Sequence, residues 1–334
     1  MNKPLVSVHM LTYNQAPYIV KAIECVLAQK TNFSFELVIG EDCSTDGTRE
    51  IVFDYAARFP SIIRVITSDE NVGMRENSSR VNVALRGKYI AWCEGDDYWQ
   101  REDKLQLQAD YLESHPDCGL VHSDQDRYFE EHHILIKNYY NETNNIPPKG
   151  YNLFEGWNGH HILTCTAMAR KELVDKVKDD VNIYKNKDYI GGLDIPLFIE
   201  LSMLSGCGYI NESLATYTVR INSACHFTDL AKQTKFSMSV LGAYLYLANK
   251  YDASAEAKVL AGRYIDASLN CALWNSDSEL ANSSIKNRYL SFKQRVMYSV
   301  VISPTFSTAL KFILRIKYDL KKKDFNRQYL GVAR

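Results

Sequence analysis

The stretch Ala91–Trp99, which reads Ala-Trp-Cys-Glu-Gly-Asp-Asp-Tyr-Trp, decides the fold of this chain. An apolar run from Tyr89 to Cys93 has the length of a buried strand and leads directly into the carboxylates of Glu94, Asp96 and Asp97. Like charges at the end of a buried strand repel one another, so they need a cation, a hydroxyl group or a proton among them. Such a set of oxygens suits Mg²⁺ or Mn²⁺ with positions left for phosphate. The alternative is an acidic turn before a helix that starts near Lys104.

Strand and helix patterns alternate around this stretch. Expected strands cover Leu5–Leu11, Phe35–Ile39, Ile62–Thr67 and Tyr89–Cys93, and apolar residues recur at helical spacing in each interval between them. This alternation predicts βαβ units and an α/β fold with a mostly parallel sheet covered by helices on both faces. Ligands of such sheets bind beyond the carboxyl ends of the strands. We therefore expect three polar turns to meet at one edge: Thr12–Asn14, Glu41–Asp46 and Glu94–Asp97.

The rest of the sequence predicts a mixed region and then a change of character near residue 230. Helices are expected at Lys104–Ser114, Lys171–Val177 and Ile195–Leu204, strands at Gly119–Ser123 and His161–Ala169, and a hairpin at Tyr209–Ile210 with Leu214–Val219. Long helical patterns follow at Phe236–Lys250, Ala255–Leu273 and Leu290–Lys323, the last interrupted at Pro304. We divide the chain into a catalytic domain, 1–230, and a C-terminal helical region, 231–334.

Composition limits the class of protein. The sequence shows no charged-then-apolar leader after Met1 and no uninterrupted apolar run of the roughly 18 residues that a membrane-spanning helix needs, so we expect a cytoplasmic protein. The eight cysteines include no Cys-x-x-Cys pair, which argues against a zinc site or a disulfide framework.

The net charge of −1 conceals an asymmetry. Residues 286–334 carry 12 Lys or Arg and 2 Asp or Glu, a net charge of +10, which leaves −11 for the rest of the chain. A basic segment with apolar residues between the charges suits an anionic surface, either a membrane or a nucleic acid. We expect no nucleic-acid partner. Two alternatives remain: a helical region packed on the catalytic domain, or an interfacial helix that brings the protein to the inner face of the cell membrane.

Four blocks in order resemble the family 2 glycosyltransferases. They are Val6–Asn14 (Val-Ser-Val-His-Met-Leu-Thr-Tyr-Asn), Gly40–Thr48 (Gly-Glu-Asp-Cys-Ser-Thr-Asp-Gly-Thr), Asn71–Gly73 (Asn-Val-Gly) and Gly87–Asp97, which ends in Glu-Gly-Asp-Asp. The resemblance covers roughly residues 4–226. It implies the GT-A fold, a Rossmann-like nucleotide-diphospho-sugar transferase architecture, and an inverting, metal-dependent transfer from a nucleotide sugar.

The resemblance also assigns roles to residues at the donor site. The nucleoside pocket is expected to be lined by Thr12, Tyr13, Asn14, Glu41 and Asp42, with Asp42 accepting a hydrogen bond from a uracil N–H. Glu94 and Asp96 are expected to contact the nucleotide. Glu94 stands where the family has the first Asp of its Asp-x-Asp motif and has a longer side chain that reaches toward the ribose. Asp96 and Asp97 are the expected ligands of Mn²⁺ or Mg²⁺. Other candidate contacts each have a structural alternative. Arg75 and Arg80 either approach the diphosphate or form a solvated helix face. His226 either contacts a metal or phosphate or is an ordinary surface histidine, and Asp46 serves equally well as a helix N-cap.

The family places its catalytic base late in the domain at the start of a helix. Asp194, in Gly-Gly-Leu-Asp-Ile-Pro, matches that position. Such a base removes the proton from the acceptor hydroxyl as the hydroxyl attacks the anomeric carbon. An N-cap role with Pro196 in the first turn is compatible with it, and Asp188 is the second candidate.

Several functions remain open at this point. The leading hypothesis is transfer of a hexose or N-acetylhexosamine from a UDP-sugar to a glycan or lipid-linked acceptor in surface polysaccharide synthesis. A sugar-nucleotide pyrophosphorylase would need a Gly-rich, basic phosphate loop after the first strand, and Thr12-Tyr13-Asn14-Gln15 offers none. An oxidoreductase that binds a dinucleotide would need Gly-x-Gly-x-x-Gly, which follows no strand. A scaffold that has kept the fold and lost activity is the non-enzymatic alternative.

Overall fold

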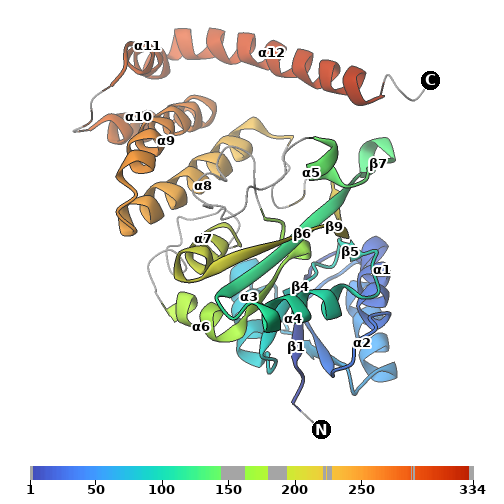
Figure 1. The fold of residues 1–334 in the computed structure, drawn as a ribbon. Helices are drawn as coiled ribbons and strands as arrows, with labels where there is room; N and C mark the ends of the chain where they lie inside the picture. The colour runs from blue at the N-terminus through green and yellow to red at the C-terminus, as the bar shows by residue number, and fades with distance from the viewer. Residues whose placement is uncertain are drawn as a thin grey trace. The chain divides into compact units, whose positions relative to one another are not determined.

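The computed structural model describes residues 3–143, 162–179, 194–220, 223, 228–286, 288 and 290–330. The chain forms two compact units: Met1–Lys185 with Leu193–Val219, and Asn186–Gly192 with Arg220–Arg334. We describe each unit by itself (Figure 1). The functional division at residue 230 stays a prediction.

The first unit is built on one mixed sheet. Its strands are β1 (Val6–Thr12), β2 (Phe35–Glu41), β3 (Ile63–Ile66), β4 (Tyr89–Trp92), β5 (Tyr98–Trp99), β6 (Cys118–Phe129), β7 (Ile134–Ile136), β8 (Met168–Arg170) and β9 (Gly206–Val219). Their order is β3-β2-β1-β4-β8-β6-β9-β5, with β7 paired to β6. The first four are parallel, whereas β8 runs antiparallel to both β4 and β6. The predicted parallel arrangement is therefore confirmed for the part of the sheet that carries the three polar turns.

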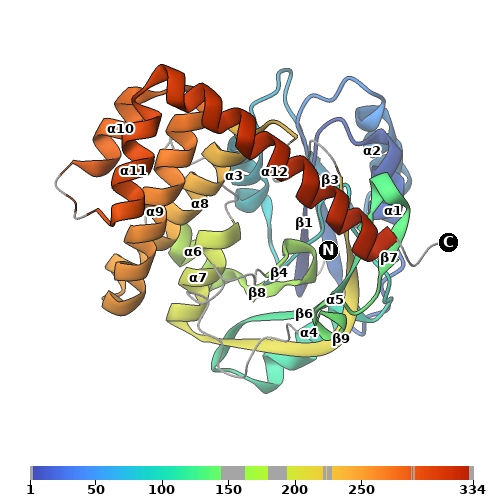
Figure 2. The same ribbon diagram turned by 90° about the horizontal axis from the view of Figure 1, so that it is seen from above.

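Helices cover both faces of this sheet. They are α1 (Ala16–Leu27), α2 (Thr48–Arg58), α3 (Met74–Ala84), α4 (Lys104–Ser114), α5 (Tyr139–Glu142), α6 (Lys171–Asp179) and α7 (Asp194–Leu204), with the short 3-10 turns η1 (Glu130–His132) and η3 (Thr164–Thr166). Alternate residues of a strand face opposite sides. The side that carries Val6, Val8 and Met10 packs on α1, α2 and α4. The side that carries Ser7 and His9 meets α3, which lies across β1 from α1 and α2 (Figure 2).

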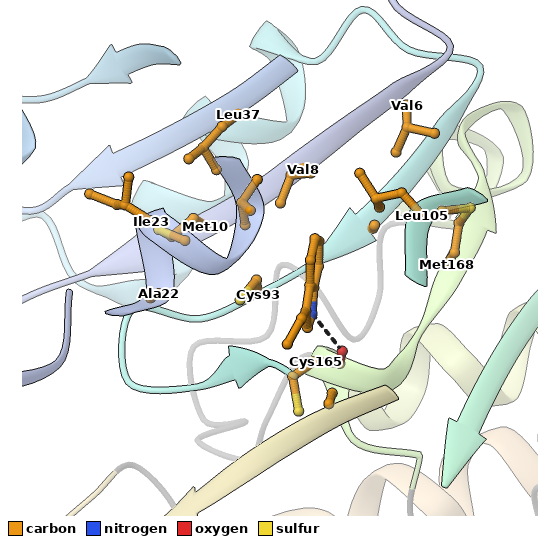
Figure 3. Packing of buried hydrophobic residues seen from close by; sticks show 14 of the residues in the cluster. Val6, Val8, Met10, Ala22, Ile23, Leu37, Cys93, Leu105, Cys165 and Met168 are labelled. Atoms are coloured by element: carbon orange, nitrogen blue, oxygen red, sulfur yellow. Dashed lines mark hydrogen bonds between the residues drawn. The ribbon is translucent and has the colours of Figure 1, made fainter. Parts of the chain in front are cut away.

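The main core lies between β1, β2, β4 and the helices α1 and α4. Figure 3 shows Val8 and Met10 of β1 directed toward the same region as Ala22 and Ile23 of α1, with Leu105 of α4 beside them. All five side chains are fully buried. The apolar periodicity that predicted α1 is thus the periodicity of its buried face: Ile19, Ala22, Ile23 and Val26.

Two expectations about the second half of the sheet were wrong. The predicted hairpin at Tyr209–Ile210 and Leu214–Val219 is one continuous strand, β9, which runs parallel to a β6 that is far longer than the predicted Gly119–Ser123. The polar residues Asn211 and Glu212 suggested a turn. They belong to β9 but have no partner in β6, because the pairing passes from Ile210 with Ser123 directly to Ser213 with Asp124. The two residues thus form an irregularity within the strand, and the chain continues along β6 instead of turning back.

The predicted strand His161–Ala169 is also different. Its described part forms η3 and only then enters β8. The Thr166 hydroxyl donates to the Leu163 carbonyl oxygen (2.7 Å), as does the Thr166 amide (3.0 Å), and these local bonds compete with strand pairing. The 3-10 turn brings Thr164 to the acidic stretch after β4.

The second unit is helical. It contains α8 (Leu230–Lys250), α9 (Ser254–Asn275), α10 (Ser278–Ile285), α11 (Phe292–Val301) and α12 (Pro304–Leu330). Pro304 begins α12, so the predicted interruption of the last helix is confirmed. A small core of Ile265, Leu269, Ala272 and Ala281 joins α9 and α10, and α11 packs against it. In the described part of the chain no single helix is long and apolar enough to cross a membrane, but the bent pair Phe292–Val301 and Pro304–Tyr318 meets that criterion by length and composition alone.

We predict that Gly40→Ala destabilises the first unit. A Cβ on Gly40 would lie 2.5 Å from Val81 Cγ2 and 2.7 Å from Asn77 Oδ1, because α3 crosses β2 at this glycine. The expected loss is about 1–3 kcal/mol of unfolding free energy, the usual cost of overpacking. Urea denaturation followed by circular dichroism measures it.

The matched control is Gly262→Ala in α9. A Cβ there would meet no atom within 4 Å, so the change should be neutral or stabilise by up to about 1 kcal/mol. Equal effects of the two substitutions would contradict the close approach of α3 to β2.

Candidate functional site

The three polar turns meet at one edge of the sheet. Thr12 is paired with Glu41 in the parallel ladder of β1 and β2. The acidic stretch after β4 is bonded to β1, because the Gly95 amide donates to the Leu11 carbonyl oxygen (3.0 Å). The convergence expected from strand order is therefore confirmed.

The loop after β2 caps the start of α1. Its side chains accept hydrogen bonds from three consecutive amides: Ser44 Oγ from Asn14 N (3.0 Å), Thr48 Oγ1 from Gln15 N (2.8 Å) and Asp46 Oδ2 from Ala16 N (3.0 Å). Asn14 has a positive φ of 50° and accepts from the Thr45 amide (2.9 Å) through Oδ1. Asp46 thus joins the loop after β2 to the start of α1, although the N-cap residue of α2 itself is Gly47. In the first turn of α1, the Ala16 amide is thus bonded to Asp46, Pro17 has no N–H, and the Tyr18 amide donates to the Gln15 carbonyl oxygen (2.9 Å). The start of this helix therefore lacks the free amides of the usual anion site.

Glu41 is enclosed by protein groups. Its side chain is fully buried, accepts from the Ser44 amide (2.6 Å) and the Thr67 hydroxyl (2.9 Å), and lies 3.6 Å from the Arg49 guanidinium. The neighbouring Asp42 holds the predicted turn Asn71–Gly73, since its two oxygens accept from the Val72 amide (2.9 Å) and the Gly73 amide (3.0 Å). Both acids therefore shape the walls of the predicted nucleoside pocket.

Tyr13 and the predicted arginines differ in how they are held. Tyr13 is 47% exposed at the edge of the sheet, so its ring is accessible to a ligand. Arg80 donates to the Thr67 carbonyl oxygen (3.3 Å) and to Asn77 Oδ1 (3.1 Å), which makes it a link between α3 and the segment after β3. Arg75 is half-buried in the first turn of α3.

Two oxygens near the acidic stretch are buried and have no hydrogen-bond partner among the residues that the structure describes. They are Thr12 Oγ1 and Gln15 Oε1. A Cβ on Gly95 would lie 2.9 Å from the first and 2.5 Å from the second, so both oxygens lie against this glycine. Buried polar atoms without a partner are uncommon in folded proteins. Thr12, a predicted nucleotide contact, therefore has an unused hydroxyl group beside the acidic stretch.

Glu94 is held by η3. Its carboxylate accepts a hydrogen bond from the Thr164 hydroxyl (2.7 Å). Burial raises the pKa of Glu94 to about 7, and the negative charges of Asp96 and Asp194 act in the same direction, while the bond from Thr164 opposes them. Asp194 therefore lies close enough to the acidic stretch to influence it electrostatically.

Asp97 is anchored to β9. Its Oδ1 accepts a hydrogen bond from the Thr218 amide (2.8 Å), and the residue is only 3% exposed. Burial raises the pKa of Asp97 well above its ordinary value, and the charges of Asp96 and Glu94 add to the effect. Asp96 lies between these two acids in the chain and is half-buried.

A buried lysine lies beneath the acidic stretch, and the sequence reasoning missed it. Lys104 is fully buried, its ammonium group donates to Gln108 Oε1 (2.6 Å), and it lies 4.3 Å from the centroid of the Trp99 ring. Burial lowers the pKa of Lys104 to about 8, and nearby acidic groups, Glu94 among them, oppose the change. Lys104 and Gln108 lie four residues apart within the apolar stripe of α4, and this pair was the available signal.

The carboxylate oxygens of the acidic stretch suit a hard divalent cation that needs few protein ligands. Among the described residues, no group of three or more His, Cys, Asp or Glu side chains is arranged to hold a metal ion. Mg²⁺ and Mn²⁺ need only one or two carboxylates when phosphate oxygens complete the shell. The mutual repulsion that raises the pKa of Glu94 and Asp97 is the repulsion that a cation would relieve. His226 and Asp188 lie outside the described residues.

Asp194 begins α7 and is half-buried. Burial raises the pKa of Asp194, and the backbone amides of Asp194 and Ile195 oppose this change. Asp194 is the first residue of the helix, one position inside the predicted N-cap, and Pro196 lies in the first turn as predicted. The raised pKa makes its carboxylate a stronger base than an exposed one.

Comparison with known proteins places this site in context. The model of the family "Glycosyl transferase family 2" matches residues 7–178. TuaG of Bacillus subtilis, whose name assigns it to teichuronic acid biosynthesis, is 36% identical over 110 residues, which are 33% of this chain and 42% of TuaG. A protein of Mycobacterium tuberculosis is 44% identical over 114 residues, which are 34% of this chain and 33% of that protein, so the chain spans about a third of the length of such relatives.

Two solved structures share the fold. Staphylococcus aureus TarS 1–349 in complex with UDP has a TM-score of 0.54 at 15% identity, covering 83% of this chain and 82% of that one. The mannosyltransferase PcManGT of Pyrobaculum calidifontis, in complex with GDP-Man and Mn²⁺, has a TM-score of 0.57 at 14% identity, covering 92% and 83%. The predicted GT-A fold with its helical C-terminal region is therefore confirmed.

We predict that Asp97 is needed for stability as an acceptor and not as a charge. Asp97→Asn keeps an oxygen for the Thr218 amide and removes a buried charge, so its unfolding free energy should stay within about 1 kcal/mol of the wild type. Asp97→Ala leaves a buried N–H without a partner and should lose about 1–3 kcal/mol. Chemical denaturation of both variants measures the difference.

The surface variant Asp110→Ala serves as the control, because Asp110 is exposed on α4. If Asp97→Ala were as stable as Asp97→Asn, the anchoring of the acidic stretch to β9 would be refuted.

Proposed function

The chain belongs to glycosyl transferase family 2, and we propose that it is an inverting, metal-dependent enzyme that transfers a sugar from a UDP-sugar to a hydroxyl group of a glycan or lipid-linked acceptor. One observation carries the proposal: the polar turns after β1, β2 and β4 meet at one edge of the sheet, and Asp194 at the start of α7 is a half-buried carboxylate outside that cluster. A glycosyl transfer of this type needs both a site for a diphosphate and a separate base.

The nucleoside would bind at the ends of β1 and β2. The exposed ring of Tyr13 offers a surface on which a base can stack. Each Asp42 oxygen accepts one backbone amide and keeps a second lone pair for a uracil N–H. Glu41 acts indirectly, because its enclosed carboxylate fixes the loop that carries Ser44. The UDP complex of TarS, which shares the fold, supports UDP as the nucleotide.

The diphosphate would lie beside Asp96 and Asp97. A divalent ion held by these two carboxylates, when bound, stabilises the negative charge that develops on the leaving nucleoside diphosphate. Asp97 keeps the stretch in place through Thr218, and Asp96 is the more accessible of the two. The Mn²⁺ complex of PcManGT supports this assignment. Arg75, in the first turn of α3, remains the proposed cationic contact of the phosphates.

Asp194 would act as the base. It takes the proton of the acceptor hydroxyl while that oxygen attacks the anomeric carbon, and the bond to the nucleoside diphosphate breaks with its electron pair on the leaving oxygen. Attack from the side opposite the leaving group inverts the anomeric centre. The name of TuaG, which refers to teichuronic acid biosynthesis, supports an acceptor that belongs to a polysaccharide.

We predict metal-dependent release of UDP. The purified full chain, incubated with a panel of UDP-hexoses and UDP-N-acetylhexosamines, should release UDP with Mn²⁺ or Mg²⁺ and none after addition of EDTA. Calorimetric titration with UDP should show tighter binding with the metal. A chain that neither turns over any nucleotide sugar nor binds UDP in a metal-dependent way would contradict the proposal, and UDP binding without any single-turnover transfer would indicate the inactive scaffold instead.

We also predict that Asp194→Asn abolishes transfer without loss of donor binding. The amide keeps the shape of the side chain and cannot accept the proton, so kcat should fall by about 10²–10⁴-fold while the Kd for UDP stays near the wild-type value. Steady-state kinetics and calorimetry together measure both quantities.

Asp175→Asn, an exposed acid on α6, is the matched control and should leave both quantities unchanged. A large loss of UDP affinity in Asp194→Asn, with transfer still detectable at saturating donor, would assign Asp194 to the donor site and remove it as the base.

A further inference from the structure

Helices α11 and α12 expose an unusual number of large apolar side chains. On α11, Phe292 is 84% exposed and Val296 is 48% exposed. The following residues Ile302 (44%), Phe306 (65%), Phe312 (69%), Ile313 (60%) and Ile316 (46%) continue the pattern. Seven of the seventeen exposed large hydrophobic residues in the described part of the chain thus lie within 25 residues. Single exposed apolar residues are ordinary, but a cluster of this kind indicates a binding surface.

These side chains share one face of each helix. With 3.6 residues per turn, Phe306, Phe312, Ile313 and Ile316 fall within an arc of roughly 120° on α12. Phe292 and Val296 are four residues apart on α11 and therefore on the same face. We call these six residues with Ile302 the apolar face.

The opposite side of α11 is fixed to its own unit. Ser291 and Gln294 form a capping box at its start, and Gln294 Nε2 donates to the Gly262 carbonyl oxygen (3.1 Å) and to Asp266 Oδ1 (3.0 Å) of α9. Met297, Tyr298 and Val301 pack on the small core of α9 and α10. On α12, Lys311 donates to Ser276 Oγ (2.8 Å). The helices are thus held by contacts that leave the apolar face outward.

The charges beside the apolar face all have one sign. Between Phe292 and Tyr318 there are five Lys or Arg residues and no Asp or Glu. Lys293, Arg295, Arg315 and Lys317 are exposed. By helical spacing, Arg315 and Lys317 lie at the two borders of the arc on α12. Apolar side chains bordered by cations complement a bilayer with anionic headgroups, where the apolar groups enter the acyl boundary and the cations meet the phosphates.

We propose that α11 and α12 form an interfacial anchor that docks the chain on an anionic lipid surface through the apolar face and its basic borders. The anchor is independent of glycosyl transfer, since no residue of the acidic stretch takes part in it. A chain held at the bilayer in this way would lie close to acceptors that are themselves attached to lipid.

Co-sedimentation of the full chain with vesicles tests the anchor. We expect binding to vesicles of equal parts phosphatidylcholine and phosphatidylglycerol, and at least tenfold weaker binding to phosphatidylcholine alone. The double variant Phe306→Ser/Phe312→Ser should lower the partition coefficient at least about tenfold, because two large apolar groups no longer leave water. Arg315→Gln/Lys317→Gln should lower it about tenfold or more on anionic vesicles only, and added salt should reproduce that loss.

The control is Phe53→Ser/Val83→Ser, which removes two exposed apolar side chains from α2 and α3 and should leave vesicle binding unchanged. UDP binding and the melting temperature should be the same in all variants, which separates failure of the anchor from failure of the proposed transferase. Absence of vesicle binding in the wild type, or equal binding by the Phe306→Ser/Phe312→Ser variant, would overturn the proposal. So would a self-association in sedimentation velocity that this variant abolishes without any vesicle binding, because the apolar face would then be an interface between copies.

Discussion

Three carboxylates at the buried end of β4 are the constraint on which the catalytic unit depends. Their burial is costly, since each charge loses water and each repels the others. The structure supplies a hydroxyl group from Thr164 of η3, an amide from Thr218 of β9 and the buried ammonium group of Lys104 on α4. These groups come from elements that are far apart in the sequence. Elements that follow the acidic stretch in the sequence, η3 and β9 among them, therefore fix the positions of its carboxylates.

Because side chains cap the start of α1, the acidic stretch becomes the main candidate site for binding a diphosphate. In many parallel sheets the first helix presents free amides to a phosphate. Here Ser44, Asp46 and Thr48 occupy the amides of residues 14 to 16. The start of α1 thus adds rigidity to the edge and contributes little to anion binding. Charge neutralisation of a diphosphate then has to come from a cation at Asp96 and Asp97 or from arginine, which is why the proposed mechanism places the metal there.

The parts of the fold that local pattern determines were predictable, and those that depend on long-range pairing were not. The alternation of strands and helices through Cys93 and the meeting of three polar turns follow from periodicity and strand order, and the structure confirms them. The predicted hairpin is instead the strand β9, in which Asn211 and Glu212 form an irregularity between two segments that both pair with β6. At the site, the sequence predicted the acidic residues but not the groups that bond to them, such as the Thr164 hydroxyl and the Thr218 amide. Lys104 is the first residue of α4, and only the packed core shows that its ammonium group lies against Trp99.

The acidic stretch and the proposed anchor together give a physical reason for the uneven distribution of charge along the chain. Residues 1–285 carry a net charge of −11, while residues 286–334 carry +10. A protein of the first composition alone would be repelled from an anionic bilayer at distances within a Debye length, about 8–10 Å at physiological salt. An acidic site for a metal and diphosphate therefore conflicts with work at such a surface, unless another part of the chain reverses the sign locally. In the proposed anchor, the exposed cations of α11 and α12 supply positive charge where the chain would contact the bilayer, and this charge offsets the repulsion.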